Sequence, residues 1–125
     1  MDQSQLQSAI DFVQRHGSSQ ERARVRHILY GEPPPDDVRE GFERSQRSDG
    51  GWAPSWSPDY ASLDATCYQL SLVDQLGIDH RSWLVIDAVR FLAERQNFDG
   101  SWEEDPAEAE AAPVWARPGD GAARL

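Results

Sequence analysis

The feature that most constrains this chain is a seven-residue pattern, Q-x-x-D-G-x-W, which occurs twice. One copy occupies residues 46–52 and the other residues 96–102, so the two begin 50 residues apart. An internal period of this length is typical of helical repeat arrays, in which each unit packs mainly on its neighbours. A weaker echo pairs AIDFV at residues 9–13 with AVRFL at residues 88–92, an offset of 79 residues. The repeats predict a helical array.

The hydrophobic spacing agrees with this interpretation. Apolar residues recur at steps of three and four, no useful length of chain alternates with period two, and the fold class is therefore predicted to be all-α. Capping residues, glycines and prolines mark the helix ends. They predict five helices and a short sixth: one ending at Gly17, then Ser18 to Gly31, Asp36 or Asp37 to about Gln46, about Ala61 to Leu76, Asp79 to about Gln96, and two turns between Asp105 and Pro113.

Three of these helices carry expectations about burial. The fifth is apolar nearly all round, so we expect it to be the most buried. The other two have one apolar face each, formed by Val25, Ile28 and Leu29 in the second helix and by Leu63, Cys67, Leu70 and Val73 in the fourth. Cys67 is accordingly predicted to be a buried core thiol.

Length and charge limit the functions open to the chain. With 125 residues we expect one small domain, 1–125. The net charge of −10 argues against a nucleic-acid partner. All 12 basic residues are arginine, which excludes lysine chemistry and favours a GC-rich bacterial genome. A single cysteine, and the lack of a signal peptide or of an apolar run long enough to cross a bilayer, predict a cytoplasmic protein without a transmembrane segment.

Each residue type in the repeated pattern has a structural use. The Gln amide can bond backbone groups left free at a helix end, and Gly permits a positive φ just beyond it. The Trp ring can bury a large apolar area against the next helix. We therefore assign a structural role to both copies, carried by Gln46, Gly50, Trp52, Gln96, Gly100 and Trp102.

The pattern resembles the QW motif of the prenyltransferase and squalene-cyclase repeat family, which includes terpenoid cyclases of the squalene–hopene type. The resemblance covers residues 36–106 and implies an α/α toroid around an apolar cavity that binds isoprenoids. The predicted helices amount to about half of an α6/α6 barrel, with an irregular tail over residues 113–125. The chain is thus expected to be a fragment, or to complete its surface by self-association.

The same resemblance directs attention to catalytic residues. Class II cyclases protonate their substrate with an Asp of a D-x-D-D motif, which is absent here; the nearest candidate is Asp64, whose alternative role is to favour the start of its helix. Protein prenyltransferases bind zinc, and the stretch around Thr66 and Cys67 resembles theirs. Their histidine ligand is replaced by Ala65, so neither a metal nor another cofactor is expected.

Aromatic residues are the candidates for a ligand surface. Trp56 and Tyr68 could line an isoprenoid cavity, the alternative being ordinary packing. The hypothesis is an isoprenoid-related repeat protein that resembles terpenoid cyclases or prenyltransferases but lacks a complete catalytic set, so the question of enzyme activity stays open. The alternative is a non-catalytic helical module that binds an apolar ligand or a partner protein.

Overall fold

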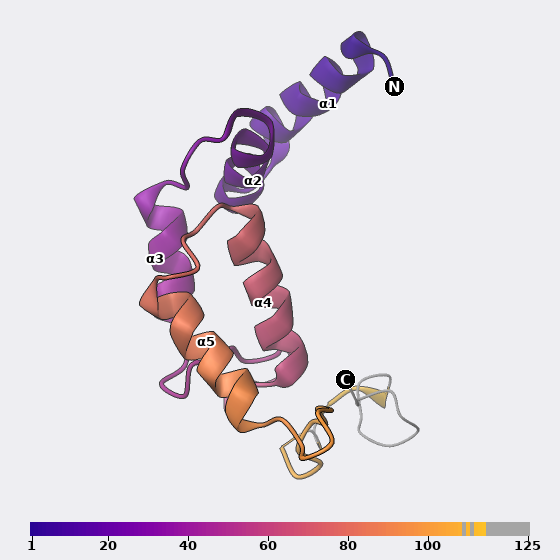
Figure 1. The fold of residues 1–125 in the computed structure, drawn as a ribbon. Coiled ribbons are helices and arrows are strands. Elements are labelled where there is room, and N and C mark those ends of the chain that lie inside the picture. Colours follow the sequence, from indigo (N-terminus) through magenta and orange to yellow (C-terminus); the bar gives the residue numbers. More distant parts are fainter. Residues whose placement is uncertain (109, 111, 115–125) are drawn as a thin grey trace.

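The structure, a computed structural model, describes residues 1–108, 110 and 112–114. The regular elements of this part are five α-helices: α1 (Gln3–His16), α2 (Ser19–Tyr30), α3 (Asp36–Ser45), α4 (Leu63–Gln75) and α5 (Trp83–Glu94) (Figure 1). The prediction of an all-α fold is confirmed. Among the described residues, no helix combines the length and the apolar character needed to cross a bilayer. Residues 115–125, most of the predicted irregular tail, lie outside this description.

Successive helices from α2 onward alternate between two sides of the molecule. Figure 1 shows α2 and α4 on one side and α3 and α5 on the other, with α1 extending away from the end of the molecule near α2. The core cluster draws on all four of the alternating helices and on Trp52 of the first repeat; its buried members are Ala23, Val38, Phe42, Trp52, Leu72, Val73, Leu76, Ile78, Leu84 and Ala88.

Several helix ends follow the predicted signals. Ser18 and Glu21 form a reciprocal capping box, in which the Glu21 amide donates to Ser18 Oγ at 3.1 Å and the Ser18 amide donates to Glu21 Oε1 at 3.3 Å. Gly31 ends α2 and Gly77 follows α4, both with positive φ. The predicted boundaries at these points are confirmed.

Three predicted boundaries are wrong. Asp36 and Asp37 are the first two residues of α3 rather than its cap, because Pro35 occupies the cap position. Asp79 does not cap α5, because its carboxylate accepts from the backbone amide of Arg81 in a turn ahead of the helix, which begins after Ser82. The short sixth helix is not formed in the described residues 105–108, which make turns.

The prediction that α5 is the most buried helix is also wrong. It buries Leu84, Ala88 and Phe91, whereas Trp83 is 73% exposed and Val89 is exposed as well. Only the face of α5 that meets α4 and the first repeat is covered by described residues. The helix therefore packs through one face although its composition is apolar nearly all round, and the uncovered face presents apolar side chains.

The apolar faces predicted for α2 and α4 are only partly correct. In α2 the buried residue is Ala23, while Ile28 and Leu29 are exposed. In α4 the fully buried position next to Cys67 is Thr66, and Cys67 itself is exposed, so the prediction of a buried core thiol is wrong. The hydroxyl of Thr66 accepts a hydrogen bond from the backbone amide of Trp52 inside the protein, and Leu63, Leu72 and Val73 are buried on the same helix.

Candidate functional site

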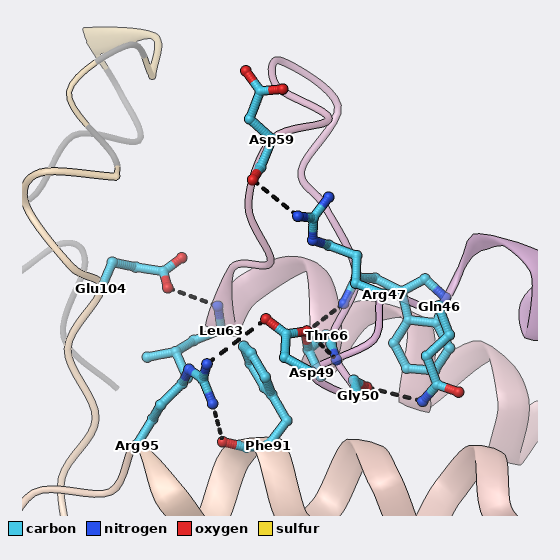
Figure 2. Close-up of polar contacts among 12 residues, drawn as sticks. Gln46, Arg47, Asp49, Gly50, Asp59, Leu63, Thr66, Phe91, Arg95 and Glu104 are labelled. Atoms are coloured by element: carbon cyan, nitrogen blue, oxygen red, sulfur yellow. Dashed lines mark hydrogen bonds and ion pairs between the residues drawn. The ribbon is translucent and has the colours of Figure 1, made fainter.

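The first loop, residues 46–52, is a closed turn held by four hydrogen bonds of its own. The amide of Arg47 donates to the carbonyl of Gly51 at 2.8 Å, and the amide of Gly50 donates back to the carbonyl of Arg47 at 2.9 Å. The carboxylate of Asp49 accepts from the amide of Gly51 at 3.1 Å. The Gln46 amide group closes the turn by donating to the carbonyl of Gly50 at 2.9 Å (Figure 2).

The first loop is also docked against the first half of α5. The side-chain nitrogen of Gln46 makes a second bond, to the carbonyl of Leu84, at 2.8 Å. Gly50 has a φ of 95°, and a Cβ added there would lie 2.2 Å from the carbonyl oxygen of Asp87. Glycine is therefore required at this position twice over, for its backbone conformation and for the closeness of α5.

Trp52 fastens the first loop to α3 and α4. Its side chain is 2% exposed. Its backbone amide donates to Thr66 Oγ1 of α4 and its indole Nε1 to Ser45 Oγ of α3, both at 3.0 Å. The amide of Ser62, the residue that caps α4, donates to the Trp52 carbonyl at 3.0 Å. One residue thus joins two helices by polar contacts and also fills the core.

Two arginines complete the surroundings of the first loop. The guanidinium of Arg47 donates to the carbonyls of Pro58 and Asp59, which holds the long segment between α3 and α4 (Figure 2). The guanidinium of Arg95 lies 3.6 Å from the centre of the Phe91 ring and 3.7 Å from the carboxylate of Asp49. The end of α5 is therefore paired with the first loop by a cation–π contact and an ion pair.

The second loop, residues 96–102, repeats the internal bonds of the first. The amide of Asn97 donates to the carbonyl of Ser101 at 2.7 Å, and that of Gly100 donates to the carbonyl of Asn97 at 2.9 Å. Asp99 accepts from the amide of Ser101 at 3.0 Å, and the side chain of Gln96 donates to the carbonyl of Gly100 at 2.7 Å. The structural role predicted for the repeated residues therefore has a definite geometry.

The surroundings of the second loop are different. Gln96 and Gly100 are exposed, and a Cβ added to Gly100 would come no closer than 3.8 Å to the side chain of Gln96. Trp102 is half-buried against the small cluster of Ala61, Leu63 and Phe91, and it donates from its indole Nε1 to the Leu92 carbonyl at 2.7 Å. The second loop is formed in the same way as the first but is not docked against a further helix of the described chain.

Glu104 connects the region after the second loop to the start of α4. Its carboxylate accepts from the amide of Leu63 at 2.6 Å (Figure 2). Partial burial raises the pKa of Glu104 above its ordinary value of 4.5, and the nearby carboxylates of Asp64 and Glu108 act in the same direction. The amides of Leu63 and Asp64 act in the opposite direction without cancelling the burial. Glu104 thus supplements the Ser62 cap by accepting from the first amide of α4, from a distant part of the sequence.

Asp64, the candidate catalytic acid, is exposed to solvent in the first turn of α4. A general acid for an alkene has to stay protonated in a site from which water is excluded. The described residues contain no group of three or more His, Cys, Asp or Glu side chains placed to hold a metal ion.

The candidate aromatic residues and Cys67 are spread along and before α4. Tyr68 is 59% exposed, and Trp56 is half-buried with its indole Nε1 donating to the hydroxyl of Tyr60 at 3.0 Å. Partial burial raises the pKa of the Cys67 thiol, and the carboxylates of Asp64 and Glu104 add to this effect, so the thiol is a poor nucleophile near neutral pH.

The sequence did not predict the part that four residues play in holding the loops in place: Ser45, Thr66, Arg95 and Glu104. Each acts through a contact between distant segments or through a position that the two loops do not share. Position 45 is the equivalent of position 95, so the Ser-to-Arg difference between the copies was the available signal. In the first loop the indole reaches Ser45 Oγ, which itself donates to the Phe42 carbonyl at 3.1 Å. In the second, the indole bonds the equivalent carbonyl directly.

Comparison with known proteins links part of the chain to one class of enzyme. A protein described as a probable squalene–hopene cyclase, from Sinorhizobium fredii (strain NBRC 101917 / NGR234), is 34% identical over 71 residues. The match covers 54% of this chain and 11% of the cyclase, so the chain spans about a tenth of that relative's length. No family model matches the chain. No solved structure matches it.

Proposed function

We propose that the chain is a wall segment of an α/α toroid of the squalene–hopene-cyclase type, and that it lacks a complete catalytic set of its own. The observation that carries the proposal is the pair of loops that share four internal hydrogen bonds, the first of which fastens α3, α4 and α5 together. The partial similarity to a probable squalene–hopene cyclase supports the same assignment.

The arrangement of the helices supports the toroid. Consecutive helices of such a fold alternate between an inner and an outer layer, and α2 to α5 alternate between two sides (Figure 1). In this proposal the first loop keeps the layers in register, because one tryptophan is bonded to both α3 and α4. The second loop would perform the same task for a helix that docks against it.

Isoprenoid contact is proposed for Tyr68 and Trp56. Tyr68 is exposed on α4, and the ring of Trp56 is held in place through Tyr60. Aromatic faces stabilise carbocations, so rings on such a wall could contact the cationic intermediates of a cyclisation. The acid that starts such a reaction is not proposed here, because Asp64 is exposed.

The experiment is a product assay on the full chain. The protein is incubated with squalene in detergent micelles, and the extract is examined by gas chromatography and mass spectrometry. We expect no cyclised product. Cyclisation that is lost in Asp64→Asn but kept in Asp74→Asn, an exposed aspartate on the same helix, would contradict the proposal and identify Asp64 as the acid.

The alternative, a module that binds a partner, is favoured by one observation. The uncovered side of α5 presents Trp83, Ile86 and Val89 to solvent at steps of three residues, and exposed apolar side chains that gather on one element favour an interface. Co-elution of squalene with the chain without turnover would favour an apolar ligand, whereas an increase in molecular mass would favour a protein partner.

A further inference from the structure

The second loop and α1 have complementary features that the proposed function leaves unused. We propose that the second loop of one copy docks against α1 of a second copy, in the way the first loop docks against α5 within one chain. This inference rests on the geometry of the two loops and on the sequences of α1 and α5; it is independent of the assignment to a cyclase framework.

The first loop defines what a docked helix has to offer. Gln46 bonds the carbonyl of residue 84, and Gly50 packs on the carbonyl of residue 87. Ala88 lies in the core cluster with Trp52, and Phe91 lies against Gly51. Arg95 then pairs with Asp49. These positions share one helix face, at steps of three, four, seven and eleven from the first.

The same face exists on α1. At the offset of 79 residues found in the sequence, the positions become Gln5, Ser8, Ala9, Phe12 and His16, so the alanine and the phenylalanine are retained. All five are exposed, Phe12 to 63%. His16 lies against the Phe12 ring with centroids 4.9 Å apart, which resembles the placement of Arg95 on Phe91.

The surface of α1 has an open hollow that a group of the second loop could enter. This hollow of about 240 Å³ lies beside the Phe12 ring and is lined by Ser8, Asp11, Phe12, Arg15 and His16. Asp99 of the second loop occupies the position of Asp49, so the guanidinium of Arg15 is the cation placed to face its carboxylate, with the His16 ring beside it. The second loop has Ser101 where the first has Gly51, and a Cβ added to Gly51 would lie 2.8 Å from the Phe91 ring. The Phe12 ring would therefore have to lie further from the second loop than Phe91 lies from the first.

The contact has to form between copies. Figure 1 places α1 and the segment that follows α5 at opposite ends of the molecule, so the two surfaces of one chain do not meet. A head-to-tail contact of this kind uses two different surfaces, and it therefore closes into a ring or continues as a linear assembly.

The first experiment is sedimentation of the full chain over a concentration series. We expect the average mass to rise above the 14.1 kDa of one chain. Ala9→Glu, at an exposed position, should weaken association about tenfold or more, whereas the matched control Gln3→Glu, exposed on another face of α1, should not. A wild-type mass that stays at one chain, or equal losses in both variants, would overturn the proposal.

The second experiment tests the direction of the contact. Gly100→Ala leaves α1 unchanged and adds a Cβ that meets no close neighbour in the single chain. The same Cβ would collide with a helix docked on the second loop, because a Cβ at Gly50 would collide with α5. Mixing Gly100→Ala with Ala9→Glu leaves one competent loop and one competent α1, so we expect a dimer that grows no further. The circular dichroism of each variant should match the wild type.

The mixture also has a control and a contradicting result. Phe98→Ala removes a fully exposed apolar ring from the same loop, at a position whose equivalent in the first loop, Ser48, is exposed. It should associate like the wild type. A mixture that stays monomeric, or association that depends on Phe98 instead of Ala9 and Gly100, would overturn the proposal. Cyclisation of squalene would contradict the proposed function and leave this mass measurement unaffected.

Discussion

The two loops of this chain share four internal hydrogen bonds and have different surroundings; the second loop adds two side-chain bonds through Ser101 Oγ. In both, the Gln side chain donates to the carbonyl of the glycine at the fifth position, and the Asp carboxylate accepts from the backbone amide two residues further on. Only in the first loop is the tryptophan, Trp52, fully buried, and only there does the glutamine, Gln46, also bond a helix carbonyl, that of Leu84. The comparison teaches that the seven-residue pattern encodes the turn, whereas the stabilisation it provides depends on the helix that packs against it.

The largest difference is expected at the tryptophans. Trp52→Ala should lower the free energy of unfolding by about 3–5 kcal/mol, because it empties a fully buried site and removes the indole bond to Ser45 of α3. Trp102→Ala should cost about 1–2 kcal/mol, because its ring is only half-buried. Urea denaturation measures both, and Trp83→Ala, at an exposed position, serves as the control. Equal losses at positions 52 and 102 would remove the distinction between the loops.

The glycines should separate the loops next. Both have positive φ, so an alanine in either costs about 1 kcal/mol or more in backbone strain. Gly50→Ala also pushes a Cβ into the backbone of α5 and should lose roughly 2 kcal/mol beyond Gly100→Ala. Thermal denaturation of dilute protein tests this. A Gly100→Ala chain that melts as low as Gly50→Ala would mean that the second loop is docked too.

A smaller difference is expected at the glutamines. Gln46→Ala removes two hydrogen bonds, one of them to α5, and should cost about 1–2 kcal/mol. Gln96→Ala removes one exposed bond and should cost about 0.5 kcal/mol. Paired urea titrations on the two variants measure the difference; a larger loss at position 96 would contradict the account.

The smallest effect concerns pH and the connection between the second loop and α4. The pKa of Glu104 is raised on folding, so the native state holds its proton more tightly than the unfolded chain. The stability from this group is present below the ordinary value of 4.5 and is lost as the pH rises through the folded pKa. Gln in its place keeps an acceptor for Leu63 and removes the charge.

Glu104→Gln should therefore become more stable relative to the wild type as the pH rises from about 4 to about 7. Urea midpoints across this range measure the trend, with the exposed neighbour Glu103→Gln as the control. A relative stability that falls with rising pH would mean that the pKa of Glu104 is lowered on folding.

The sequence predicted the helices better than their packing. Periodicity and caps located α1, α2 and α4 well, because capping and apolar spacing are local properties. The buried face of α4 was predicted around Cys67, whereas Cys67 is exposed and Thr66 is buried. The hydroxyl of Thr66 accepts a hydrogen bond from the backbone amide of Trp52 in a distant loop. No periodicity reveals such a bond.

The candidate site shows the same limit. The six repeated residues were predicted from their spacing, and the loops they form have a shared geometry. Their unequal docking was not predicted, because it depends on which helix faces each loop. The exposure of α5 is the clearest case: its composition suggested full burial, but the described chain covers only one of its faces.

The most direct test of the central claim is hydrogen exchange at two equivalent amides. The amide of Arg47 donates to the carbonyl of Gly51 at 2.8 Å and that of Asn97 to the carbonyl of Ser101 at 2.7 Å, so the two backbone bonds are equivalent. The second loop has two further side-chain bonds, through Ser101 Oγ, and only the first loop is docked against α5. The measurement uses protein dilute enough to sediment as one chain of 14.1 kDa. The Arg47 amide should exchange about 100-fold more slowly than that of Asn97, after correction for intrinsic rates. Equal protection, or greater protection at Asn97, would contradict the claim that docking against α5 stabilises the first loop alone.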